Sequence, residues 1–242
     1  MLWWSAKMRN WYVGLMLLIV GCNTATAPVP APSPTADTPL VTATPVADAP
    51  VEPDTPFALE DGFRLLTRSD FDAFGAEDGT WSEIPEGLAC TGKPRGYLYS
   101  HDSFQNFTWR LEYRYPRPES LKDDTKFKGN TGFMIYITGE HKIWPVSLEV
   151  QGKHVQIGMI KENGGASAPT VEDHPEVRES ARKPVGQWNR LEIVSKDGEL
   201  SVTLNDQPLS KSTPAFLSAG SIGIQAEDHP FEVRRMRIRV DP

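Results

Sequence analysis

The sequence predicts an all-β fold, a sandwich of two antiparallel sheets. The clearest of several alternating segments is 106–115, in which Phe107, Trp109 and Leu111 alternate with polar residues. Successive side chains of a strand point to opposite faces, so such a segment packs one face on a core. Turn-forming Gly, Pro and Asn residues separate these segments, and no long stretch has the periodicity of an amphipathic helix.

The strands of the first half are short and are separated by turns. They are expected at 63–66, 81–84, 87–90, 96–99 and 106–115. A polar loop follows, and Gly129-Asn130-Thr131-Gly132 then turns into a strand over 133–137. This turn places an amide side chain immediately before a predicted strand.

The second half repeats the pattern around one long interruption. Strands are expected at 144–151, 155–160, 186–193, 199–204, 221–227 and 231–240. The tripeptide Lys196-Asp197-Gly198 between two of them is a strong hairpin signal. The segment 161–184 contains Gly and Pro without periodicity, which predicts a long surface loop.

The N-terminus has the features of a targeting segment. Lys7 and Arg9 precede an apolar stretch, 11–20, that is too short to span a bilayer, and Cys22 follows it. This segment resembles a bacterial lipobox, which implies cleavage before Cys22 and acylation of that cysteine. We therefore expect a lipoprotein that faces the periplasm or the cell exterior; an ordinary secreted protein is the alternative.

These features divide the chain into three parts. The expected signal peptide covers 1–21, and the folded domain covers 57–242. Between them, 22–56 is rich in Ala, Pro and Thr and contains no aromatic residue. Such a composition buries too little apolar surface to offset the entropy of ordering, so it predicts a disordered tether.

Charge and cysteine content exclude several classes of partner. The formal net charge is −7, and acidic and basic residues are dispersed, which argues against nucleic acid and against an anionic membrane surface. The expected membrane contact is therefore the lipid anchor alone. Cys22 and Cys90 are the only cysteines, so acylation of Cys22 would leave Cys90 as a lone, buried thiol. Neither has the neighbouring histidines that a zinc site needs.

Two predicted strands carry a carboxylate and an amide on the face opposite their apolar residues. In 144–151, Glu149 and Gln151 share one face because they are two residues apart, and in 221–227 the same holds for Gln225 and Glu227. A solvated strand face is the plainer interpretation of either pair alone. Together, the two strands could line one sugar-sized groove, because amides and carboxylates are good partners for vicinal hydroxyls.

Other polar and aromatic residues are weaker candidates. The histidines show no metal-ligand spacing; they are His101, His141, His154, His174 and His229. His154 is the most interesting of them because it closely follows the strand of Glu149. Trp144 could stack on a sugar ring, although packing is the commoner role of such a residue. Arg234 is two residues before Met236 and four before Ile238, so we expect it on their face, in a buried ion pair.

The domain resembles the bacterial family of 3-keto-disaccharide hydrolase domains, whose fold is a concanavalin A-like jelly roll. The resemblance spans 63–240 and rests on several short motifs taken together. They are Gly129-Asn130-Thr131-Gly132, Leu148-Glu149-Val150-Gln151, Gly186-Gln187-Trp188-Asn189, Ile222-Gly223-Ile224-Gln225 and Val233-Arg234-Arg235-Met236-Arg237-Ile238. Thr131 stands where the family more often has Ser, and Arg235 where it more often has Asn.

The resemblance implies a hydrolase or lyase that acts on 3-keto-glycosides, which are oxidised disaccharides, at the cell envelope. It implies Glu149 as the base that removes the acidified proton, with Glu227 as the alternative. Asn130, Gln151 and Gln225 would bind hydroxyls or the enolate oxygen, and a divalent metal could polarise the ketone. Because the same sandwich also serves lectins, a non-catalytic carbohydrate-binding module is the rival interpretation.

Overall fold

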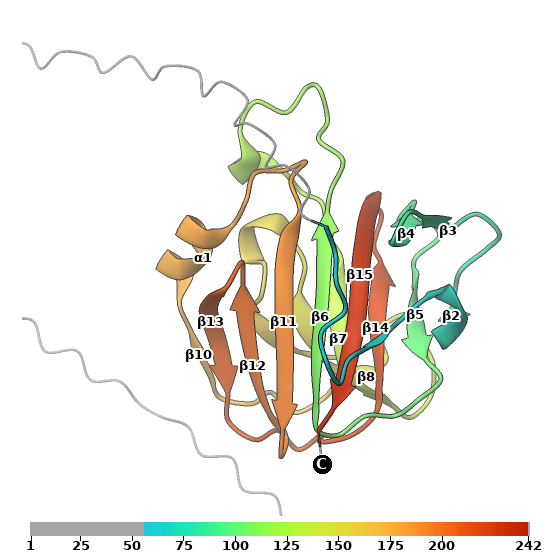
Figure 1. Ribbon diagram of the computed structural model, residues 1–242, viewed down its shortest axis with the longest axis vertical. Helices are drawn as coiled ribbons and strands as arrows, with labels where there is room; N and C mark the ends of the chain where they lie inside the picture. The colour runs from blue at the N-terminus through green and yellow to red at the C-terminus, as the bar shows by residue number, and fades with distance from the viewer. Residues whose placement is uncertain (1–55, 242) are drawn as a thin grey trace, which may run out of the picture. The chain divides into compact units, whose positions relative to one another are not determined.

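The computed structural model describes residues 56–241, which form a sandwich of two antiparallel sheets (Figure 1). One sheet has nine strands, in the order β10 (Val171–Asp173), β13 (Gln207–Ser212), β12 (Glu199–Leu204), β11 (Asn189–Lys196), β6 (Phe107–Arg114), β15 (Phe231–Val240), β4 (Gly87–Cys90) and β3 (Trp81–Ile84), with β1 (Arg64–Leu65) also paired to β15. The other has six, in the order β2 (Phe71–Phe74), β5 (Gly96–Ser100), β14 (Ser221–Ala226), β7 (Gly132–Thr138), β8 (Val146–Gln151) and β9 (Ile160–Asn163). The predicted all-β sandwich is confirmed.

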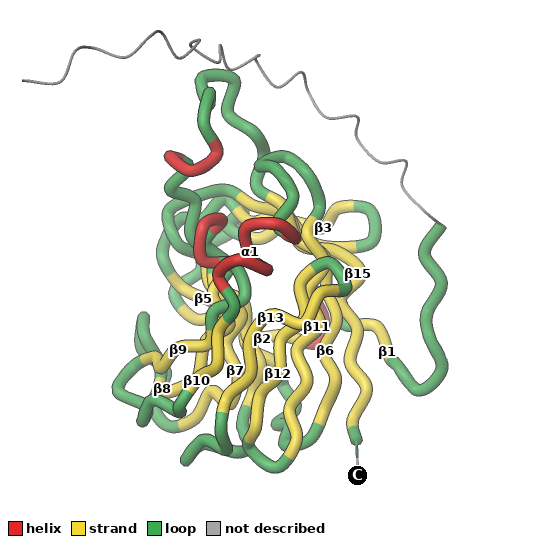
Figure 2. The backbone as a smooth tube through the Cα atoms, turned by 90° about the vertical axis from the view of Figure 1, so that its left-hand side faces the viewer, coloured by secondary structure: helices red, strands yellow, loops and turns green. Residues whose placement is uncertain are grey.

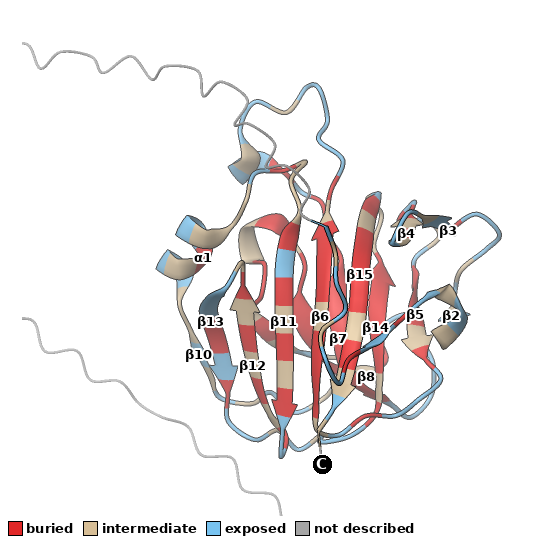
Figure 3. Cartoon of the chain, viewed as in Figure 1, coloured by how far each residue is buried: buried red, intermediate tan, exposed pale blue. Residues whose placement is uncertain are grey.

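The core lies between the two sheets and is built from the apolar faces that the alternation predicted. Phe107, Trp109 and Leu111 of β6 are buried, and the Trp109 ring meets the Phe133 ring of β7 edge to face at 5.9 Å. Ile222 and Ile224 of β14 belong to the same cluster. Figure 3 shows buried residues along the central strands, including β6 and β14. Each such side chain contributes about 1.5–3 kcal/mol through removal from water.

The segment predicted as a long surface loop contains three regular elements. β9 pairs with β8, β10 pairs with β13, and the helix α1 (Pro175–Ala181) lies beside β13 (Figure 2). Pro175 opens the helix, where its fixed φ is favourable, and buried Arg178 donates from Nε to the Ile157 carbonyl at 2.8 Å. These elements are too short for periodicity to reveal them, and tertiary pairing specifies them instead.

Two other predicted strand boundaries are wrong in the same region. The expected strand 155–160 is a 3-10 turn at His154–Gln156, and β9 starts only at Ile160. The expected strand 144–151 begins at Val146, so Trp144 lies on the preceding bend. Within residues 56–241, two further 3-10 turns are Arg68–Asp70 and Asp124–Lys126. Among residues 56–241 no helix has the length and apolar character needed to cross a bilayer.

A β-bulge in β15 changes the predicted position of Arg234. Arg235 has φ +52, and the pairing with β6 shifts register between Arg234 and Arg237. The extra residue puts Val233 and Met236 in the core and turns Arg234 to the other face, so its predicted shared face with Met236 is wrong. The predicted ion pair is present: Arg234 Nε lies 2.8 Å from Glu112 Oε2, and both side chains are largely buried.

Cys90 ends β4 inside the core. It is buried, as expected, and it forms no disulfide among the described residues. Burial raises the pKa of the thiol to about 12, so it is protonated and unreactive at neutral pH. The expected signal peptide, Cys22 and all of the tether except Pro56 lie outside the described residues.

Candidate functional site

The candidate site lies on the face of the six-stranded sheet that points away from the core. Side chains of directly paired residues share a face of an antiparallel sheet. One register row therefore crosses the whole sheet on this face, namely Asp72, Tyr99, Gly223, Met134, Glu149 and Lys161. The neighbouring row includes Phe74, Tyr97 and Gln225. The predicted polar faces of the two Gln- and Glu-bearing strands thus do belong to one surface.

β8 and β14 are not adjacent, and a glycine allows their side chains to meet. Both strands flank β7, where Gly132 stands between them. A Cβ atom at Gly132 would lie 2.5 Å from Glu149 Oε1 and 2.4 Å from Gln225 Oε1. Both distances are shorter than a non-bonded contact allows, so a side chain here would displace the two polar groups. The absence of a side chain at residue 132 is therefore what brings Glu149 and Gln225 together.

The turn before β7 positions the second carboxylate. Asn130 Nδ2 donates to Glu227 Oε2 at 2.6 Å, and the backbone of Asn130 bridges to Glu227 and Asp228. The buried Thr131 hydroxyl donates to the Gln225 carbonyl at 2.7 Å, a bond that a serine could also make. Arg95 forms an ion pair with Asp228 beside Glu227. The motif Gly129-Asn130-Thr131-Gly132 thus links both halves of the site.

Burial raises the pKa of both carboxylates, and their different neighbours make the two shifts unequal. Burial raises the pKa of Glu149, although the charge of Lys161 and the nearby Gln225 amide oppose that shift. The pKa of Glu227 rises to about 7, first through burial and then through the negative charge of Glu149, while Arg95 opposes the shift. Glu227 therefore keeps its proton up to about pH 7, and repulsion by the charge of Glu149 contributes to this.

Several polar groups of the site have no hydrogen-bond partner. Gln225 is 1% exposed, and neither its Oε1 nor its Nε2 completes a hydrogen bond, although the amide lies close enough to Glu149 to favour the charged carboxylate. Asn130 Oδ1 is also buried and unpaired. Unpaired buried polar atoms cost about 1–3 kcal/mol each, and a bound ligand with hydroxyl or carbonyl groups would satisfy them.

Lys161 is a member of the site that the sequence did not reveal. It faces Glu149 directly across the β8–β9 pairing, and its charge lowers the pKa of both Glu149 and Glu227. In the described part of the chain it forms no ion pair. The residue was hidden because it falls in the segment that lacks periodicity; prediction of β9 would have placed it opposite Glu149.

The other predicted site residues lie around this centre or away from it. Gln151 is buried on the same face, and its Oε1 accepts a hydrogen bond from the Lys153 backbone at 2.8 Å. Trp144 is 38% exposed and shows no hydrogen bond or ring contact to the carboxylate pair. His154 is buried instead against Asp124, 4.0 Å from its carboxylate, and against the Phe127 ring.

The environment of His154 is that of a structural residue. Burial and the positive charge of Arg182 lower the pKa of His154 to about 4, so its ring is neutral at pH 7. Neither carboxylate of the site contributes to that shift. His154 therefore lies outside the group formed by Asn130, Glu149, Gln225 and Glu227.

A metal site is not evident near the carboxylates. In residues 56–241 no three His, Cys, Asp or Glu side chains are grouped so that they could hold an ion. Asn130 and Gln225 could add oxygen ligands, but Lys161 brings a positive charge to the same place. The residues present therefore fit a cation poorly, and no step proposed below passes through one.

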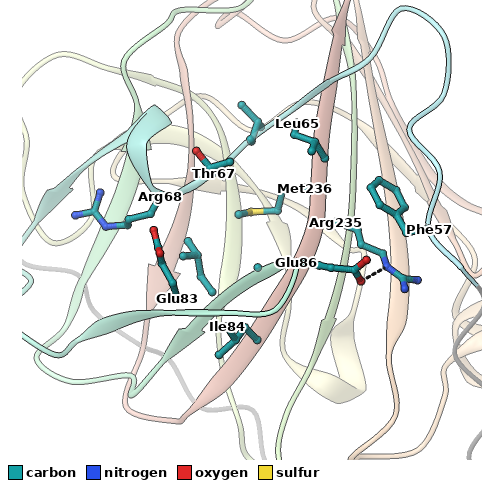
Figure 4. Close-up of a pocket in the computed structure, with 12 residues that line it drawn as sticks. Phe57, Leu65, Thr67, Arg68, Glu83, Ile84, Glu86, Arg235 and Met236 are labelled. Atoms are coloured by element: carbon teal, nitrogen blue, oxygen red, sulfur yellow. Dashed lines mark hydrogen bonds and ion pairs between the residues drawn. The ribbon is translucent and has the colours of Figure 1, made fainter.

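A separate cavity of about 420 Å³ lies at the bulge of β15 (Figure 4). Leu65, Ile84 and Met236 line it, and Glu86 Oε2 accepts from Arg235 Nε at 2.8 Å at its edge. None of its lining residues belongs to the carboxylate site. The lining residues come from β1, β3, β4 and β15, which belong to one sheet, and from the segments that join them.

Fold and site together define a β-sandwich with a carboxylate pair, one member buried and the other half-buried, on one sheet face. Residues 62–239 match the family of 3-keto-alpha-glucoside-1,2-lyase-like domains, so the chain belongs to that family, and its function is carbohydrate-related. A comparison with proteins of curated function found no match. The resemblance stated from the motifs is confirmed.

Solved structures agree with the fold. Two proteins of Parabacteroides distasonis, both provisionally assigned as glycosyl hydrolases, share 14% and 18% identity with TM-scores of 0.56 and 0.54. These alignments cover 76% and 74% of this chain and 99% of each of those chains. The carbohydrate-binding module CBM66 of Bacillus subtilis shares 16% identity over 72% of this chain and 99% of its own, with a TM-score of 0.52.

Proposed function

We propose that this domain is a lyase that cleaves 3-keto-glycosides, with Glu149 as the base and Glu227 as the acid. The observation that carries the proposal is a carboxylate pair whose members differ in proton affinity and lie beside an unpaired, buried amide. An elimination needs one group to take a proton and another to give one, and unequal carboxylates in one site supply both. The family to which the chain belongs supports the substrate class.

The reaction begins at the carbon next to the ketone. Ionised Glu149 removes the proton from the second carbon, and the electron pair moves into an enolate with the third carbon and its oxygen. The ketone then re-forms, a double bond forms between the first and second carbons, and the glycosidic bond breaks. The leaving oxygen takes the proton held by Glu227. The products are an unsaturated ketone sugar and an alcohol, to which water can later add.

The developing negative charge on the ketone oxygen needs stabilisation. Lys161 brings a positive charge to the carboxylate pair, and the buried Gln225 amide Nε2 has no hydrogen-bond partner. Donors fixed in advance act most strongly in a buried site, because the low dielectric strengthens the interaction and no reorganisation is needed. Asn130 keeps Glu227 in place through its 2.6 Å hydrogen bond.

A non-catalytic sugar-binding module is the second candidate. The free amide atoms of Gln225 and Asn130 would serve a bound sugar as well as a reacting one. A binding module has no need of a carboxylate with a pKa near 7, because a buried charge weakens the fold without aiding recognition. This difference favours the enzyme.

The decisive experiment incubates the chain without residues 1–21 with 3-keto-glucosides and with their unoxidised parents, each with and without a chelator. We expect the oxidised compounds alone to be cleaved. Chromatography measures the alcohol that is released. Binding of either compound without turnover would instead establish the sugar-binding module.

A substitution at Gly132 tests where the site lies. In Gly132→Ala the added methyl group meets the ends of Glu149 and Gln225, so we expect turnover to fall by about tenfold to a hundredfold. The melting temperature should change little, because flexible side-chain ends can move aside. In the control Gly87→Ala the Cβ would meet the Val233 backbone at 2.0 Å, so that variant should lose stability but keep its activity per folded molecule. Full activity in Gly132→Ala would place the site elsewhere.

We also propose that the domain is carried on a lipoprotein whose mature chain starts at an acylated Cys22. The proposal rests on the lipobox-like end of the apolar N-terminal stretch. Intact-mass analysis of a bacterial membrane fraction should find lipid on Cys22, and Cys22→Ser should release the protein from membranes. A mature chain that retains Lys7, or an unmodified Cys22, would defeat the proposal.

A further inference from the structure

An ion pair between Arg95 and Asp228 lies at the edge of the carboxylate site. Arg95 donates to Asp228 Oδ2 from Nε, at 2.8 Å, and from Nη2. Arg95 comes directly before Gly96 on the chain. Gly96 pairs in register with Ala226, which comes directly before Glu227. The backbone therefore brings Arg95 to the same end of the sheet as Glu227, yet its guanidinium is bound to the next residue, Asp228.

The backbone fixes the position of Asp228. This residue has φ +66, in the left-handed region that favours glycine, and its N–H donates to the Gly92 carbonyl at 2.7 Å. A Cβ atom at Gly92 would lie 2.4 Å from the His229 backbone, so the two loops are in close contact. Glycine would form this turn with less strain. The side chain of Asp228 adds the ion pair with Arg95.

Charges of both signs lie near the Glu227 carboxyl. The titratable and polar groups around it, on neighbouring elements and on its own turn, are Glu149, Lys161, Arg95, Asp228, Asn130, Tyr115 and His229. Burial and then Glu149 raise the pKa of Glu227. Arg95 is the strongest influence that lowers this pKa, whereas the charge of Asp228 raises it. Hydrogen bonds from Arg95 lower the pKa of Asp228, so that carboxylate stays charged while Glu227 titrates.

We propose that Asp228 is a positioning residue, which holds the Arg95 guanidinium away from Glu227 so that Glu227 keeps the proton it donates. This inference rests on the proposed lyase function, in which Glu227 is the acid, and it adds what regulates that acid. Without the Asp228 carboxylate, the guanidinium is free to turn to the carboxyl beside it. A carboxyl that is bound to arginine loses its proton at lower pH, and it then has no proton to give to the leaving oxygen.

The ion pair itself should add little to folding stability. The side chain of Arg95 is 55% exposed and that of Asp228 is 38% exposed. Water screens such a pair, and exposed ion pairs have small effects on unfolding. Asparagine also adopts the left-handed backbone conformation, so Asp228→Asn removes the charge and keeps the turn. Loss of the pair should therefore appear in the titration of Glu227 and not in the melting temperature.

The test follows the pH dependence of kcat/KM for a 3-keto-glucoside in Asp228→Asn. We expect the alkaline midpoint, which reports Glu227, to fall by about one pH unit. Activity should then drop by about tenfold at about pH 8 and stay within about twofold at about pH 5.5. Arg95→Gln should move the midpoint in the opposite direction, because it removes a cation that favours the charged carboxyl. An unchanged midpoint in Asp228→Asn would overturn the inference.

Asp206→Asn is a matched control. Asp206 also has a left-handed backbone, with φ +68, and forms an exposed ion pair with Arg190 in the turn between β12 and β13. This turn belongs to the nine-stranded sheet, and neither residue is among the groups that shift the pKa of Glu227. The control should therefore leave the midpoint unchanged. A shift equal to that of Asp228→Asn would show that loss of any such ion pair suffices, against a positioning role.

A double-mutant cycle separates this role from a direct effect of the Asp228 charge. In the Arg95→Gln background, Asp228→Asn should lower the Glu227 midpoint by less than about half of its effect in the unsubstituted chain. Equal effects in both backgrounds would mean that Asp228 does not act through Arg95. Titration of the Glu227 carboxyl by NMR measures these midpoints without substrate. The expected shifts in a chain that cleaves no 3-keto-glycoside would refute the lyase alone, and cleavage without the shifts would refute the positioning role alone.

Discussion

Glu149→Gln should lower kcat/KM for a 3-keto-glycoside by a factor of about a hundred or more. Glutamine keeps the size of the side chain but cannot accept the proton from the second carbon of the substrate. Because Glu149 is 7% exposed, the substitution also removes a carboxylate whose charged form burial disfavours, so the melting temperature should stay the same or rise. Initial rates and thermal unfolding of the same preparation measure both effects.

Glu162→Gln is a matched control for this variant. Glu162 lies next to Lys161 on β9, but it is exposed and pairs with Leu148 in register, so its side chain points to the other face. The same change of charge in the same sheet should leave turnover within twofold. If Glu149→Gln turned over as fast as the unsubstituted chain, Glu149 would have no part in the mechanism, and Glu227 or a binding role would remain.

The alternation of apolar residues was sufficient to predict most of the sandwich. β6, β11 and β12 are long and have clean period-two patterns, because one face of each packs on the core. β2, β9 and β10 have three or four residues and pair at or near sheet edges, where burial is partial and the pattern is weak. The bulge at Arg235 is a single-residue insertion that reverses parity, and no local signal distinguished it from a continuous strand.

The site was predictable only within each strand. The two-residue spacing placed Glu149 beside Gln151 and Gln225 beside Glu227, since parity is a local property. The distance between the two strands depends on sheet order, and one strand proved to lie between them. Two further features depend on the register between separate segments of the chain. Gly132 leaves space for the side chains of Glu149 and Gln225, and Lys161 faces Glu149. His154, singled out because it closely follows the strand of Glu149, lies in a 3-10 turn against Asp124 instead.

The pH dependence of stability should report on Glu227. Its pKa in the folded chain is about 7, above the value of 4.5 for a free carboxyl, so folding favours its protonated form. The stability that this group contributes is fully present below pH 4.5 and is lost as pH rises through about 7. We therefore expect the melting temperature to fall by a few degrees across this range in the unsubstituted chain and in Glu162→Gln. In Glu227→Gln that part of the slope should be absent.

The two carboxylates should also be linked, which gives the sharpest test of the pair. The charge of Glu149 is the second cause of the raised pKa of Glu227, after burial. Glu149→Gln should therefore lower the pKa of Glu227 and move the alkaline loss of stability to lower pH, whereas Glu162→Gln should not. Titration of the Glu227 carboxyl by NMR measures this shift directly. A midpoint that Glu149→Gln leaves unchanged would mean that the carboxylates titrate independently, and the division of roles between base and acid would lose its physical basis.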